Sequence, residues 1–262
     1  MTRLGRALAG AIIGGVALAA TVAQASANGC AVPEGAIFHI CAGEGAASLL
    51  LLPEDWPPER ASAADLLVTG AYTGKDTRGE GIAAPVGLLL RDGALIGRNI
   101  ARMDGILLID PENGQPRLYR RDGVMLRGQN YDLSPLDQRE AFFAAAGAAG
   151  VSALQSHLLV IEGRVDTRAV DGAPEAQRRI LYTMPDGAFG IWQSDSALTL
   201  DAAARAVAAA VAPEMALNLD MGSFDFCLAR RPDAAPAPCG VVGLRQMPGR
   251  LSNLLRLSRR TP

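Results

Sequence analysis

Short apolar runs that alternate with turn residues are the feature that most limits how this chain can fold. Runs such as Ile106–Ile109 are too short to form helices, and glycine, proline or aspartate borders most of them. The first two runs are expected to pair as a hairpin around Gly43-Glu44-Gly45. The expected strands are Ala36–Cys41, Ser48–Leu52, Leu66–Thr69, Val86–Arg91, Ala94–Ile96, Ile106–Ile109, Arg117–Arg120, His157–Glu162, Arg179–Met184, Ala188–Gln193, Met215–Leu219 and Phe224–Leu228.

Two longer stretches have the composition and capping residues of helices. Ser134-Pro135 combines a hydroxyl cap with proline at the first helical position, and the good helix formers of Leu136–Ala146 follow it. Thr199 precedes a second stretch, Leu200–Ala212. The segment Leu251–Leu257 fits either a strand or an amphipathic stretch. We therefore expect an α+β domain with a mixed sheet, in which strands outnumber helices.

Residues 1–27 have the pattern of a secretory signal peptide. Two arginines precede the apolar stretch Ala7–Ala20, and Ala25-Ser26-Ala27 supplies small residues for cleavage. The apolar stretch is too short to span a bilayer core of about 30 Å, which needs about 20 apolar residues. We expect cleavage, rather than an uncleaved anchor, to leave no stable transmembrane span. Residues 28–262 are then expected to fold as a single domain in a periplasmic or secreted protein.

Export favours disulfides for the four cysteines. Cys30 and Cys41 form one sequence pair, and Cys227 and Cys239 form another. Three connectivities are open, and the two local pairings close the smallest loops. A lipid anchor on Cys30 is the alternative, although the preceding residues lack the usual aliphatic side chain. No metal site is expected, because neither pair has zinc-ligand spacing and the two histidines lie far apart in the sequence.

The charge pattern and several absent motifs exclude common functions. The chain has 25 Lys and Arg against 27 Asp and Glu, without a basic run, so nucleic acid is not an expected partner. Gly79–Ala84 has G-x-G-x-x-A spacing, but Pro85 and a strand-like run follow it where a dinucleotide site needs a helix. No G-x-S-x-G serine elbow is present. We therefore expect no cofactor.

Polar residues gather at the ends of the expected strands. Asn218 and Asp220 alternate along one strand and so share a face, and Ser223 lies in the turn that follows. Gln155-Ser156 opens another strand, and Arg178-Arg179 opens a third. A carboxylate, a guanidinium and amide or hydroxyl groups can bind an anionic sugar derivative and act at its glycosidic oxygen. The alternative is that these are ordinary turn residues and a solvated arginine.

The order of these segments resembles the phosphodiester glycosidase family, which includes relatives of the lysosomal uncovering enzyme. The resemblance covers roughly residues 66 to 229, and its most specific segment is Ala216–Ser223. It implies a domain of that family's fold, with Asp220 and Arg179 as catalytic residues. It also implies that the substrate is bound by Gln155, Ser156, Asn218 and Ser223. The other matching segments are Pro85–Leu88 before Asp92-Gly93, Gln155-Ser156 leading to Leu158–Val160 and Gly163, Arg179 before a strand pair, and Leu198–Leu200.

The resemblance implies that the protein is an exported hydrolase, which cleaves a sugar from a sugar-1-phosphodiester of envelope glycan. Arg179 would pair with the phosphate, and Asp220 would act as acid/base or would stabilise the oxocarbenium ion. A second carboxylate would come from Asp76, Glu80 or Glu162. No cofactor or metal is implied.

The chain departs from the family pattern beside these residues. Thr69-Gly70-Ala71 replaces an Asn-Gly-Gly segment, and His157-Leu158 replaces Gly-Pro. Ile180–Thr183 replaces a small, glycine-containing stretch, and Met221 replaces glycine. Bulkier groups at these places favour an alternative, a non-catalytic envelope protein of the same fold that binds glycan or a partner protein. A purely structural exported domain is the third hypothesis.

Overall fold

The computed structural model describes residues 30–55, 64–74, 83–221, 225–230, 237–239 and 251–260. The predicted signal peptide, Ser223, and both Asp76 and Glu80 lie outside these residues. Residues Pro33–Pro262 form one compact unit, which is the unit described below.

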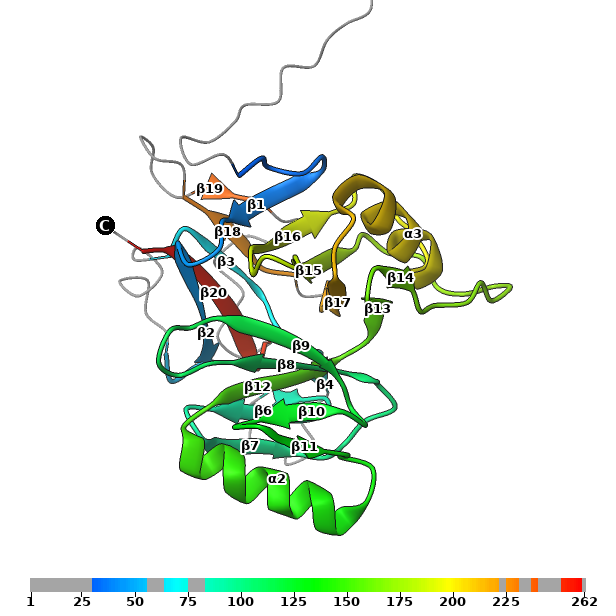
Figure 1. Ribbon diagram of the computed structural model, residues 1–262. Coiled ribbons are helices and arrows are strands. Elements are labelled where there is room, and N and C mark those ends of the chain that lie inside the picture. The colour runs from blue at the N-terminus through cyan, green and yellow to red at the C-terminus, as the bar shows by residue number, and fades with distance from the viewer. Residues whose placement is uncertain are drawn as a thin grey trace, which may run out of the picture. The chain divides into compact units, whose positions relative to one another are not determined.

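Three antiparallel sheets make up most of this unit (Figure 1). Sheet 1 has the order β1 (Ala36–Ile40), β16 (Phe189–Gln193), β15 (Arg179–Thr183), β17 (Met215–Leu219), β13 (Leu158–Ile161), β14 (Arg164–Val165). Sheet 2 has the order β7 (Ala94–Arg98), β6 (Leu88–Arg91), β12 (Ser152–Ser156), β8 (Gly105–Ile109), β9 (Pro116–Arg120). Sheet 3 has the order β19 (Ala237–Pro238), β18 (Cys227–Ala229), β3 (Leu66–Thr69), β20 (Asn253–Arg259), β2 (Gly45–Leu51). Two short pairs complete the described strands: β4 (Thr73–Gly74) with β5 (Ala84–Pro85), and β10 (Val124–Leu126) with β11 (Gln129–Tyr131).

One hydrophobic cluster joins the three sheets. It includes Leu217 of sheet 1, Leu107 of sheet 2 and Leu255 of sheet 3, all of them fully buried. Burial of large aliphatic side chains of this kind contributes about 1.5–3 kcal/mol each. Residues far apart in the chain are therefore fixed around a shared core, and the strand ends next to that core have defined positions.

Each helix covers one outer face. Helix α2 (Leu136–Ala149) packs Phe142 and Ala146 on the strands of sheet 2. Helix α3 (Leu200–Val211) packs Ala203 and Val207 on sheet 1, beside β13 and β14 (Figure 1). The predicted α+β class, with strands outnumbering helices, is confirmed.

Of the two predicted helix caps, Thr199 is confirmed and Ser134 is wrong. Thr199 caps α3 as expected, because its hydroxyl accepts a hydrogen bond of 3.1 Å from the Ala202 backbone N–H. Ser134 does not cap α2: the cap residue is Pro135, and no side chain caps this end. Both helices were correctly placed in the sequence.

The predicted hairpin of the first two strands is wrong. Strand β1 pairs with β16 in sheet 1, and β2 pairs with β20 in sheet 3. Residues of Leu251–Leu257, which fitted two descriptions, lie mostly in β20, between β3 and β2. Both differences come from pairing between distant parts of the chain, which local periodicity does not report.

The cysteines form disulfides. Cys227 and Cys239 are bridged, with Cα atoms 4.8 Å apart, which confirms one of the predicted local pairings. Cys30 and Cys41 are also in disulfide form. Such bonds persist in oxidising compartments, so they agree with a periplasmic or extracellular location. No helix among the described residues is long and apolar enough to cross a membrane.

Candidate functional site

Strand β17 ends beside the end of β3, and this junction holds Asp220. The Asp220 backbone N–H donates to the Gly70 carbonyl at 3.0 Å. Its carboxylate Oδ2 accepts a hydrogen bond of 3.2 Å from the Thr73 backbone N–H. Asp220 is only 6% exposed. A buried carboxylate is thus held in place by backbone from a different sheet.

Asn218 and Tyr72 are joined by a hydrogen bond next to this carboxylate. The Asn218 amide Nδ2 donates to the Tyr72 hydroxyl at 2.5 Å and to its neighbouring Leu219 carbonyl at 2.9 Å. Burial raises the pKa of the Tyr72 phenol, and the Asp220 carboxylate raises it further; Arg178 and the Asn218 hydrogen bond act in the opposite direction. Tyr72 therefore stays protonated at neutral pH.

Arg178, the residue directly before the adjacent strand β15, lies near enough to Tyr72 for its charge to lower the pKa of the same phenol. In the β15–β17 pair, Arg179 lies opposite Leu219, so continuing that register by one residue sets Arg178 beside Asp220. Its Nε donates to the Leu198 carbonyl and its Nη2 to the Pro174 carbonyl, both at 2.8 Å. The third nitrogen, Nη1, has no hydrogen bond to the described residues. The half-buried guanidinium is thus oriented and keeps donors for a ligand.

His157 lies against Tyr72 on the other side of β17. The two rings meet edge to face, with centroids 6.1 Å apart. Burial lowers the pKa of His157; the Asp104 carboxylate raises it and Arg178 lowers it. The His157 carbonyl accepts from the Asn218 backbone N–H at 2.9 Å, so this histidine is fixed to β17. Its imidazole is mostly neutral at pH 7.

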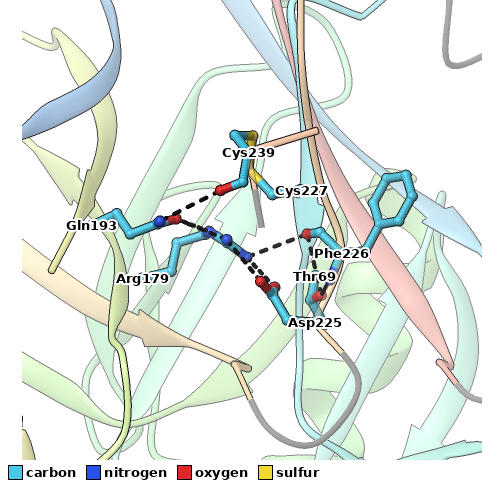
Figure 2. The surroundings of a disulfide bond; sticks show 7 residues. All are labelled: Thr69, Arg179, Gln193, Asp225, Phe226, Cys227 and Cys239. Carbon is cyan, nitrogen blue, oxygen red and sulfur yellow. Dashed lines mark hydrogen bonds and ion pairs between the residues drawn. A yellow bond between two sulfur atoms is a disulfide. The ribbon is translucent and has the colours of Figure 1, made fainter. Parts of the chain in front are cut away.

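Arg179, the arginine predicted to meet a phosphate, points to the opposite face. Its guanidinium is fully buried and binds both oxygens of Asp225, at 2.5 and 3.2 Å. It also donates to Gln193 Oε1 and to the Phe226 carbonyl. Figure 2 shows this group between Asp225 and Gln193, beside the Cys227–Cys239 disulfide. These bonds occupy all five N–H donors of the guanidinium.

Gln155, the predicted amide of the pocket, also makes its hydrogen bonds to the protein's own backbone. Its Oε1 accepts from the backbone N–H groups of Leu88 and Ala101, and its Nε2 donates to the carbonyls of Ala101 and Met103. A Cβ at Gly87, which has a φ of +90°, would approach Gln155 Oε1 to 2.6 Å. The backbone therefore wraps closely around this side chain and uses its full hydrogen-bonding capacity.

The structure brings together only part of the predicted set. Asp220 and Asn218 share one face, and the Ser156 hydroxyl donates to the backbone carbonyl of Asn218 behind them. Tyr72, Arg178 and His157 join them, although none of the three was predicted from the sequence to have a role in the site. Strand alternation offered one signal for Arg178, because residues 178 and 179 must face opposite ways. We call Asp220, Asn218, Tyr72, Arg178 and His157 the Asp220 cluster.

A cavity of about 750 Å³ lies at the other end of sheet 1. It is lined by the β15–β16 turn, by the start of β17 and by β9, and it includes Glu162. Glu162 therefore lies far along β13 from Asp220 and does not join the cluster. Within the described part of Pro33–Pro262, no group of three His, Cys, Asp or Glu side chains lies close enough to hold a metal ion.

Comparison with solved structures identifies similar folds. The catalytic domain of zebrafish N-acetylglucosamine-1-phosphodiester alpha-N-acetylglucosaminidase, auto-inhibited by its pro-peptide, matches with a TM-score of 0.50 and 13% identity, over 82% of this chain and 73% of that one. An exported protein of Burkholderia pseudomallei K96243 matches with a TM-score of 0.52 and 13% identity, over 82% and 71% of the two chains. No protein-family model and no curated protein sequence matches the chain significantly. At this identity the similarity establishes the fold alone.

Proposed function

We propose that this chain is an exported hydrolase that cleaves the sugar from a sugar-1-phosphodiester of envelope glycan. One observation carries the proposal: Asp220 directly follows β17, Arg178 directly precedes the neighbouring strand β15, and the two charges both shift the pKa of the Tyr72 phenol. An oriented cation beside a buried carboxylate suits a substrate with an anion next to a glycosidic carbon.

Arg178 takes the phosphate-binding role in this proposal, in place of Arg179. Guanidinium groups bind phosphate oxygens through paired N–H donors, and Nη1 of Arg178 is available for this. Carbonyls hold its other nitrogens, so little side-chain entropy remains to be lost when the anion binds. Arg179 instead holds Asp225, two residues before β18, in place.

Asp220 acts at the anomeric carbon. The bond from this carbon to the phosphate oxygen breaks, and the oxygen leaves with the electron pair. The carboxylate stabilises the positive charge on the sugar ring and accepts the proton of the water that adds to the carbon. The products are the free sugar and a phosphate monoester.

A phosphate leaving group removes the need for a second carboxylate. Glycosidases need a general acid because an alkoxide leaves poorly, whereas a phosphate monoester has a second pKa of about 6 and leaves as an anion. Arg178 neutralises the charge that develops on this oxygen. The absence of Glu162 from the cluster is compatible with this chemistry.

The competing proposal is a glycan- or partner-binding protein that does not turn over its ligand. The specific observation in its favour is the side chain of Tyr72, which follows Thr69-Gly70-Ala71 where the family pattern has Asn-Gly-Gly. A phenol at this place reduces the space beside Asp220. This proposal predicts saturable binding of sugar phosphates and no product.

The test uses N-acetylhexosamine 1-(4-nitrophenyl phosphate) in water enriched in ¹⁸O. We expect free sugar and 4-nitrophenyl phosphate, with the label in the sugar, because the carbon–oxygen bond breaks. Arg178→Gln should raise KM at least tenfold, while Arg168→Gln, an exposed arginine without an ion pair in the described structure, should match wild type. No turnover, or label found only in the phosphate product, would overturn the proposal.

A further inference from the structure

The side-chain oxygen of Asn218 is buried and has no hydrogen-bond donor among the described residues. Asn218 is 1% exposed, and its Oδ1 makes no hydrogen bond within the part of the chain that the structure describes. Exchanging the oxygen and nitrogen of the amide does not solve this, because the Leu219 carbonyl can only accept and therefore requires Nδ2. A buried acceptor without a donor is unfavourable, because it has lost its hydrogen bonds to water and gained none in the protein. Such an atom in the Asp220 cluster points to a donor on a ligand.

Tyr72 offers the complementary group. Its hydroxyl oxygen accepts from Asn218 Nδ2, so its own proton is available to donate. Burial raises the pKa of this phenol, so the proton stays in place across the neutral range. The cluster thus presents an acceptor, Asn218 Oδ1, and a donor, the Tyr72 O–H, on two side chains that are hydrogen-bonded to each other.

We propose that Asn218 and Tyr72 form a recognition pair for the sugar substituent on the carbon next to the anomeric carbon. A hydroxyl there can donate to Oδ1 and accept from Tyr72, and an amide N–H can donate to Oδ1. This inference rests on the proposed function, because it places Asp220 at the anomeric carbon. Asn218 precedes Asp220 by two residues on the same face, roughly 7 Å along the strand, so one ring placed between them can meet Asp220 at the anomeric carbon and Asn218 at the next substituent.

The test compares glucose 1-phosphate with 2-deoxyglucose 1-phosphate by calorimetry on the exported chain with its disulfides intact. We expect the 2-deoxy compound to bind at least about tenfold more weakly, because it leaves Oδ1 buried without a donor. Wild-type protein suffices for this measurement, so it does not depend on the folding of any variant. Equal binding of the two compounds would overturn the recognition pair and leave the proposed hydrolysis standing.

Variants at Asn218 and Tyr72 test whether the recognition pair causes the difference in affinity between the two compounds. Asn218→Leu should bind both compounds with equal affinity. Tyr72→Phe, which keeps the ring against His157, should lose part of the difference in affinity. Asn130→Leu, an exposed position on β11, should keep the wild-type difference. If Asn218→Leu keeps it too, the inference is wrong.

Two further outcomes separate this inference from the proposed function. Discrimination without turnover of the diester would refute hydrolysis but support the pair. Binding of neither sugar phosphate would refute both.

Discussion

Replacing Arg179 by methionine should destabilise the fold strongly, because it leaves the Asp225 carboxylate buried without its cation. Arg179 is fully buried, the Asp225 side chain is only 5% exposed, and the two are joined at 2.5 and 3.2 Å. Breaking a buried ion pair from one side costs about 3–5 kcal/mol. For a domain of this size each kcal/mol lowers the melting temperature by about 2–4 °C, so we expect a loss of roughly 6–20 °C.

The assay is urea unfolding followed by circular dichroism, with Tm from a thermal scan as a second measure. The double variant Arg179→Met/Asp225→Leu is the matched control. It removes both charges and replaces them with apolar volume, so it should be more stable than the single variant. A single variant that loses less than about 1 kcal/mol, or a double variant that is no better than the single one, would refute this account of Arg179.

Two more predictions concern pH and redox state. Burial lowers the pKa of both His39 and His157 below 6.5, so near and below that pH the unfolded chain binds more protons than the folded chain. The free energy of unfolding should therefore be highest above pH 6.5 and should fall as the pH drops towards the pKa values of the two histidines in the folded state. Urea midpoints at pH 7.5 and 5.5 check this, and a His39→Gln/His157→Gln variant with an unchanged pH dependence would contradict it. Removing the Cys227–Cys239 bridge with a double serine variant should cost about 3 kcal/mol by loop entropy, measured by urea unfolding, and no loss would contradict this estimate.

Local sequence rules placed both helices and most strands, because these depend on periodicity and capping. These rules did not predict which strands pair with each other. The residues of Ala36–Cys41 and Ser48–Leu52 do form strands, but each pairs with a strand from the second half of the chain. Such pairing depends on which apolar faces are buried together in the shared core, and one segment does not contain that information.

The candidate site shows the same limit. Asp220 and Asn218 were found because they alternate on one predicted strand, so their common face follows from the sequence. Choosing between Arg178 and Arg179 requires the register of β15 against β17, which only the folded sheet provides. Gln155 was expected to open the strand that leads to Glu162, but it lies near the end of β12, and backbone groups from two distant segments take up its hydrogen bonds.

The most direct test is turnover of the same diester by wild type and by Asp220→Asn, with folding checked by circular dichroism. The substitution keeps the size of the side chain and an oxygen that can accept from Thr73, but it removes the negative charge that the carboxylate supplies at the anomeric carbon. We predict that kcat falls at least a hundredfold while glucose 1-phosphate still binds. A correctly folded Asp220→Asn protein with the wild-type rate would contradict the account.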